Sequence, residues 1–131
     1  MKRLLATLAL ATVALAAAAC SSTVAGEPTK PAGTPAPADP NAIVVVADQM
    51  KFEQAEVAVP AGTPFQLRFE NRESAPHNVA IYTDASASKL VYQGEIFSSG
   101  TRVYEVPALD AGSYFFRCDV HPDMIGTIVA K

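Results

Sequence analysis

From residue 42 to residue 131, short runs of alternating apolar and polar residues are separated by glycines and prolines. This two-residue period predicts strands with one buried face, and no window in this range shows the 3.6-residue period of an amphipathic helix. The glycine-containing turn Pro60–Pro64 joins two such runs, and residues 71–76 and 84–89 are predicted as longer loops. The strands are predicted at Ile43–Val46, Val57–Val59, Phe65–Phe69, Val79–Ile81, Leu90–Tyr92, Val103–Val106, Tyr114–Cys118 and Thr127–Val129.

About seven or eight short strands with regular turn signals predict an all-β fold, a Greek-key sandwich or barrel. In the run that ends at Cys118, residues Tyr114, Phe116 and Cys118 share one face because side chains alternate along a strand. The two aromatic residues are natural core residues. The thiol of Cys118 is therefore expected to point inward, with Arg117 pointing outward.

The first 19 residues have a different pattern. Lys2 and Arg3 precede the Ala-rich apolar stretch Leu4–Ala19, which ends in small residues directly before Cys20. This order predicts a signal peptide over residues 1–19, and the stretch is shorter than the roughly 20 strongly apolar residues of a spanning helix. Export of the protein is therefore expected.

Cys20 stands where bacterial lipoproteins carry their acylated cysteine, although Ala17 occupies a position where leucine is usual. A lipid on Cys20 would anchor the protein to the outer face of the cytoplasmic membrane. The alternative is cleavage by a general signal peptidase, which would leave a free Cys20 and a secreted soluble protein. The expected location is the cell envelope, either the outer face of the cytoplasmic membrane or the periplasm.

Residues 20–41 are predicted to be a Pro/Ala-rich linker that begins at the Cys20 anchor. Five of the protein's ten prolines lie in this segment, which lacks apolar periodicity. Such a composition favours disordered, extended conformations, and at about 3.1 Å per residue the linker could reach on the order of 60 Å. The predicted organisation is therefore a signal peptide (1–19), a linker (20–41) and one domain (42–131).

The charge and cysteine content of residues 42–131 narrow the possible functions. Seven basic and eleven acidic residues give this domain a net charge of −4, which argues against a nucleic acid partner. Cys118 is its only cysteine, and it has no disulfide partner if Cys20 carries a lipid. Ligation of a metal would protect such a thiol in an oxidising compartment. The alternative, a buried free cysteine, leaves His121 and Met124 unexplained.

Cys118, His121 and Met124 follow one another at three-residue spacing directly after a predicted strand, and His77 is the only other histidine. Taken singly, a histidine is more often structural and a methionine more often part of the core. Together, two imidazoles, a thiolate and a thioether favour a copper ion that cycles between Cu(I) and Cu(II). Zinc is a poorer fit because a thioether is a weak zinc donor.

Two further motifs accompany this spacing: Pro-His-Asn-Val at residues 76–79 and Gly-x-Tyr-x-Phe-x-Cys at residues 112–118. With them, residues 42–131 resemble the cupredoxins, the small blue-copper electron carriers, and especially the amicyanin and plastocyanin group. The resemblance implies one mononuclear type 1 copper. It also implies that the backbone amide of Asn78 bonds the copper-bound sulfur. The implied ligands are His77, Cys118 and His121 in a trigonal plane and Met124 as the long axial ligand.

Four protein donors leave no position for a substrate, which favours electron transfer over catalysis, so the protein is not expected to be an enzyme. The resemblance makes His121 the electron-transfer surface, within an apolar patch that includes Pro76, Pro122 and Ile125. The expected partners are unidentified redox proteins that give and take electrons, and the protein is expected to be a monomer. A copper chaperone or storage protein of the cell envelope, or a copper-free adhesion or scaffold domain, stays as an alternative.

Asp119 and Asp123 flank His121. Negative charge near the metal is predicted to favour Cu(II) and so to lower the reduction potential. The alternative interpretation makes both residues solvated loop acids without influence on the metal.

Overall fold

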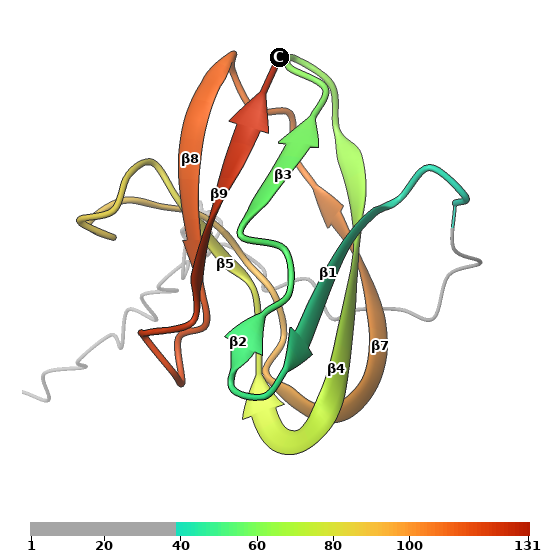
Figure 1. The fold of residues 1–131 in the computed structure, drawn as a ribbon. Helices are drawn as coiled ribbons and strands as arrows, with labels where there is room; N and C mark the ends of the chain where they lie inside the picture. The colour runs from blue at the N-terminus through green and yellow to red at the C-terminus, as the bar shows by residue number, and fades with distance from the viewer. Residues whose placement is uncertain (1–38) are drawn as a thin grey trace, which may run out of the picture.

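The computed structural model describes residues 39–131, which form nine strands in two sheets. Figure 1 shows the two sheets packed into a sandwich, which confirms the all-β prediction. One sheet has the order β2 (Lys51–Phe52), β1 (Ile43–Asp48), β4 (Phe65–His77), β7 (Phe97–Val106). The other has the order β3 (Glu56–Val59), β9 (Ile125–Ala130), β8 (Gly112–Arg117), β5 (Ala80–Tyr82), β6 (Leu90–Gln93). The two-residue strand β2 is the one that the sequence pattern did not indicate. Within residues 39–131 no helix is long and apolar enough to cross a membrane.

The core lies between the sheets and is built from the alternation seen in the sequence. In β4, Phe65, Leu67 and Phe69 are buried, and the residues between them are half-buried. Across the sandwich, the ring of Phe116 in β8 lies 5.0 Å from the ring of Phe52, centroid to centroid. Each large apolar side chain buried in this way contributes about 1.5–3 kcal/mol. This core holds the ends of β4 and β8, from which the candidate ligands project.

The prediction of a loop at residues 71–76 is wrong, because these residues belong to β4. The pairing of β4 with β7 runs to Asn71 and Gly100, shifts at a bulge, and resumes at Pro76 and His77. Asn71 is buried, and its side-chain amide donates to the carbonyls of Ala75 and Phe97, both at 2.8 Å. This network keeps the polar segment attached to the sheet, and β4 curls at its lower end in Figure 1. By contrast, the loop predicted at 84–89 is confirmed, since no strand lies between β5 and β6.

The expected orientation of the strand before Cys118 is confirmed at its two inner positions. Phe116 and Cys118 are fully buried, whereas Tyr114 is only half-buried. Gly126 in β9 lies opposite Phe116, and a Cβ at this position would be 2.3 Å from the phenyl ring. Glycine is therefore required here by the ring. Arg117 does not simply point into solvent, because its guanidinium lies 4.9 Å from the centre of the Tyr82 ring.

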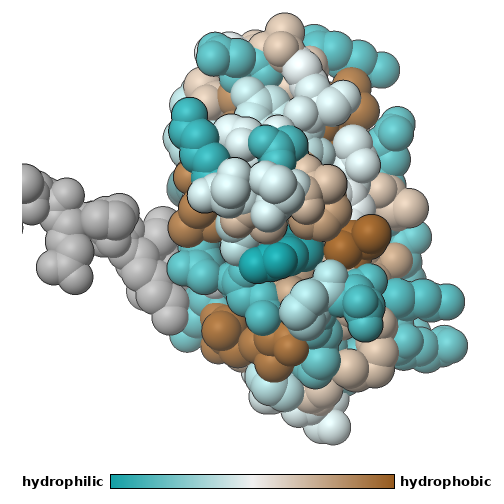
Figure 2. Space-filling model, turned by 90° about the vertical axis from the view of Figure 1, so that its left-hand side faces the viewer, coloured by the Kyte–Doolittle hydropathy of each residue, from teal (hydrophilic) through white to brown (hydrophobic). Residues whose placement is uncertain are grey.

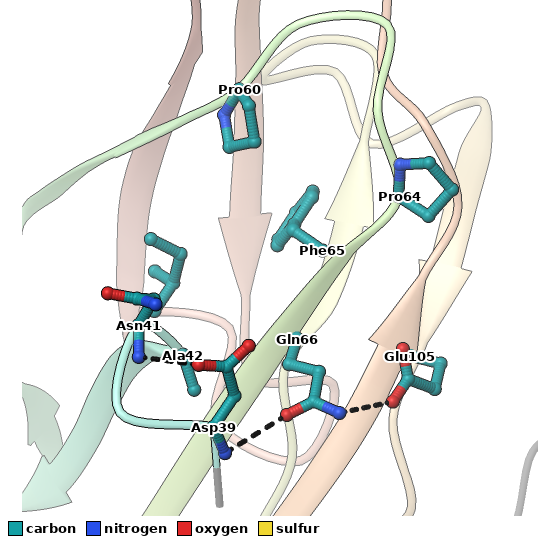
Figure 3. Close-up of a pocket in the computed structure, with 9 residues that line it drawn as sticks. Asp39, Asn41, Ala42, Pro60, Pro64, Phe65, Gln66 and Glu105 are labelled. Carbon is teal, nitrogen blue, oxygen red and sulfur yellow. Dashed lines mark hydrogen bonds between the residues drawn. The ribbon is translucent and has the colours of Figure 1, made fainter.

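A shallow cavity of about 260 Å³ lies at the start of β4, at the opposite end of this strand from His77. Figure 3 shows hydrogen bonds across it: the backbone N–H of Asp39 donates to Gln66 at 3.4 Å, and Gln66 donates to Glu105 at 2.7 Å. No cysteine, histidine or methionine is among its lining residues within the described range. The cavity is therefore separate from the candidate metal centre.

Candidate metal centre

Three segments bring the four predicted ligands to one end of the sandwich. His77 is the last residue of β4, Cys118 directly follows β8, and the remaining two ligands lie in the loop that leads to β9. Two backbone hydrogen bonds close this loop: the N–H of Met124 donates to the carbonyl of His121 at 2.9 Å, and the N–H of Cys118 donates to the carbonyl of Met124 at 3.0 Å. The three-residue spacings of the sequence thus become a compact turn.

The potential donor atoms of His77, Cys118 and His121 face one another. The Nδ1 atoms of the two histidines are 3.1 Å apart, and the Sγ of Cys118 lies 3.7 Å from His77 Nδ1 and 3.8 Å from His121 Nδ1. A point equidistant from the corners of this triangle lies about 2.1 Å from each atom, within the range of about 2.0–2.3 Å for metal–nitrogen and metal–sulfur bonds. The three atoms are therefore spaced as ligands of a single ion.

Burial differs among the four predicted ligands. His77 and Cys118 are fully buried and Met124 is 1% exposed, whereas His121 is half-buried. Among the four, only His121 is exposed to an appreciable extent. The centre is therefore nearest to solvent at this residue.

Glu73 is a contact of the centre that the sequence did not reveal. Its carboxylate accepts a hydrogen bond of 2.9 Å from Nε2 of His77. With the proton on Nε2, the Nδ1 atom of His77 presents its lone pair to the other donors. A carboxylate behind a metal-binding histidine is a common arrangement that fixes the ring. No spacing rule identifies Glu73, because only the bulge in β4 brings it to the histidine that follows four residues later.

The carboxylate of Glu73 also holds the tip of the β1–β2 hairpin. It accepts the backbone N–H of Met50 at 3.1 and 3.2 Å. Met50 and its neighbour Gln49 have φ angles of +59° and +52°, in the left-handed region that L-residues with side chains seldom adopt. Two consecutive positive φ angles are those of a tight hairpin turn. Glu73 therefore links this strained turn to His77.

Asn78 is fully buried beside the centre, and its hydrogen bonds are made by its side chain. Its Oδ1 accepts the backbone N–H of Asp119 at 2.8 Å, and its Nδ2 donates to the Asp119 carboxylate at 2.9 Å. The bond from its backbone amide to the sulfur of Cys118 stays a prediction. The side-chain pair was not foreseen, because residues 78 and 119 are far apart in the sequence.

The donor set itself limits the choice of ion. Two histidine nitrogens and a cysteine sulfur, each carrying lone pairs, repel one another at these distances unless a proton or a cation lies between them. Two imidazoles and one thiolate in a trigonal arrangement, with a methionine nearby, are the donors of blue-copper sites. The residues present therefore fit a type 1 copper.

A family model described as a cupredoxin-like domain matches residues 6–130 of the chain. The chain belongs to the cupredoxins. Amicyanin from Paracoccus denitrificans is 30% identical to this cupredoxin over 125 residues, which cover 93% of this chain and 92% of the relative. The prediction of one type 1 copper as the cofactor is confirmed by the family and by the clustered donors of His77, Cys118 and His121, with Met124 buried in the same loop.

Solved structures also resemble this cupredoxin. A Cu(I) form of an amicyanin variant superposes with a TM-score of 0.57 at 31% identity, covering 72% of this chain and 86% of the other. A reduced auracyanin from Roseiflexus castenholzii superposes with a TM-score of 0.62 at 18% identity, covering 69% of this chain and 96% of the other, and shows the common fold.

Proposed function

We propose that this cupredoxin carries single electrons between exported redox proteins that dock over His121. The observation that supports it most is the closed donor set, in which a thiol and two imidazole nitrogens lie within 4.8 Å of one another. Because protein atoms occupy this set, the centre offers a substrate no evident place to bind. A bound type 1 copper supplies the one-electron couple, and the protein holds its ligands in one arrangement.

The surface around His121 supports docking by weak, mainly apolar contact. Pro76, Pro122 and Ile125 each adjoin a ligand in the sequence and are exposed, Ile125 at 52%. Val120, next to His121, is 40% exposed. Figure 2 shows the side of the molecule that faces left in Figure 1, where apolar residues form separate groups among polar ones. Small apolar areas of this kind suit partners that bind briefly.

Addition of Cu(II) to the metal-free protein tests the site. We expect an intense thiolate-to-copper charge-transfer band in the visible spectrum of the wild type and no such band in Cys118→Ser. The absence of the band from the wild type would refute the proposed site. Fast, reversible one-electron reduction of the loaded protein then distinguishes a carrier from a copper chaperone, which should instead release its ion to an acceptor protein.

We also propose that a lipid on Cys20 holds the protein at the outer face of the cytoplasmic membrane. In the described part of the chain, Asp39 lies beside Gln66 at the start of β4, whereas His77 ends the same strand. A tether that reaches the domain from residue 38 therefore joins it away from the ligands, which leaves the His121 side accessible. Globomycin should cause the precursor to accumulate in expressing cells but should not affect a Cys20→Ser variant. Normal processing of the wild type under globomycin would exclude lipidation.

A further inference from the structure

The residues that directly follow two ligands are bonded to each other. Asn78 follows His77 and Asp119 follows Cys118. The backbone N–H of Asp119 donates to the side chain of Asn78 at 2.8 Å, and that side chain donates back to the Asp119 carboxylate at 2.9 Å. A reciprocal pair of this kind restricts both distance and orientation between two segments. It therefore fixes Cys118 relative to His77.

The same carboxylate is held by a second pair of donors from the neighbouring hairpin. The hydroxyl of Tyr82 in β5 donates to its Oδ1 at 2.7 Å, and Nε2 of Gln93 in β6 donates to its Oδ2 at 2.6 Å. The Nε of Arg117 lies 3.8 Å from Oδ1. The Asp119 side chain is 18% exposed, so this network is largely shielded from water. Asp119 thereby joins both ligand segments to the β5–β6 hairpin.

Every group that contacts the Asp119 carboxylate is a hydrogen-bond donor or a cation: the side-chain amides of Asn78 and Gln93, the hydroxyl of Tyr82 and the guanidinium of Arg117. Such surroundings suit a negatively charged side chain. A charged carboxylate thus lies one residue from Cys118, where its partial burial reduces screening by water.

Asp123 provides the contrast within the same loop. It is exposed, and its side chain makes no hydrogen bond or ion pair with any residue between 39 and 131. Both acids lie two residues from His121 and carry the same charge. Their positions in the sequence are therefore equivalent. Only the fold shows that the carboxylate of Asp119 is held by hydrogen bonds whereas that of Asp123 is solvated.

We propose that Asp119 is a positioning residue of the metal centre, whose carboxylate fixes Cys118 against His77 and favours the oxidised state of the bound ion. This inference rests on the proposed function, since it concerns the redox behaviour of the same site. A fixed negative charge attracts Cu(II) more strongly than Cu(I), because the oxidised ion carries more positive charge. Asp123 has little part in this effect.

The test compares Asp119→Asn with Asp123→Asn in the full-length, copper-loaded protein by measuring the reduction potential. For Asp119→Asn we expect the affinity ratio of Cu(I) to Cu(II) to rise about tenfold, which raises the potential by about 59 mV. For Asp123→Asn we expect a change of no more than about threefold. Equal shifts in the two variants, or no rise in Asp119→Asn, would overturn the proposal.

Tyr82→Phe keeps the charge but removes one of its donors, so it separates charge from general loosening of the site. Without this donor, less of the negative charge on the carboxylate is offset, so Cu(II) is favoured further. We therefore expect the reduction potential of Tyr82→Phe to fall below that of Tyr114→Phe, a control whose lost hydroxyl bonds the carbonyl of Asp110. A rise in Tyr82→Phe, or a value equal to the control, would overturn the proposal even if Asp119→Asn failed to fold.

A readout without copper tests the positioning role. In the metal-free protein, the backbone amide of Asp119 should exchange with solvent deuterium at least tenfold faster in Asp119→Asn than in Asp123→Asn, because one acceptor of the network is lost. Equal protection would contradict positioning. Failure of the wild type to form the charge-transfer band would instead contradict the proposed function, so the two failures are distinguishable.

Discussion

Replacement of Asn71 by alanine tests whether the bulge in β4 is what positions His77. The side chain is 2% exposed and makes three hydrogen bonds: two to carbonyls, at 2.8 Å each, and one from the N–H of Glu73, at 2.9 Å. Water has little access to the groups left behind, and each lost bond costs about 1 kcal/mol. We therefore expect the free energy of unfolding to fall by about 3 kcal/mol. A domain of this size has only about 5–14 kcal/mol in total.

The assay is urea denaturation of the metal-free protein, followed by competition titration with a Cu(I) chelator. Because the bulge carries Glu73 and leads into His77, Asn71→Ala should also weaken copper binding at least tenfold. Ser74→Ala is the matched control, since Ser74 is exposed in the same segment and its side chain bonds none of the described residues. A loss of stability below about 1 kcal/mol, or unchanged copper affinity, would refute the reasoning.

Three further predictions follow from single contacts. Glu73→Gln removes the carboxylate charge that lies 2.9 Å from Nε2 of His77. At an effective dielectric constant of about 20, a charge this close to a ligand is worth on the order of 2 kcal/mol, so voltammetry should show a higher reduction potential, with no change in Glu105→Gln at the far end of the sandwich. Gly126→Ala should lower the free energy of unfolding by about 1–3 kcal/mol in urea denaturation, because its Cβ would contact the Phe116 ring; an unchanged midpoint would contradict this. Burial, with a smaller contribution from Glu105, raises the pKa of Tyr92 to about 12. The folded state disfavours the ionised form of this group, so the protein is expected to lose about 2–3 kcal/mol of stability as the pH rises from about 10 towards 12. Tyr92→Phe should flatten that decline in thermal denaturation, and an equally steep decline would exclude this source.

Burial of the Tyr92 hydroxyl carries a desolvation cost that only the three-dimensional structure reveals. Its hydroxyl is buried without a hydrogen-bond partner among the described residues. In the sequence it is one more aromatic residue in an alternating strand, and nothing distinguishes it from Tyr104, whose hydroxyl reaches the carbonyl of Glu95 at 3.1 Å. Whether a buried hydroxyl is satisfied depends on neighbours from other strands.

Local patterns in the amino-acid sequence were sufficient to predict the class of the fold and the chemistry of the metal centre. Alternation of apolar residues is a local property, so it predicted most strands and turned Cys118 inward. The ligand types and their spacing are local as well, and they were sufficient to indicate copper because few other ions suit a thiolate, a thioether and two imidazoles.

The contacts that hold the metal centre in place depend on the three-dimensional fold. The polar run before His77 reads as a loop until the buried side chain of Asn71 is seen to attach it to β7. Glu73 and Asp119 are ordinary charged residues in the sequence, and their contacts with the centre come from a bulge and from a pair 41 residues apart. Long-range hydrogen bonds of this kind depend on the register between strands, which no local pattern encodes.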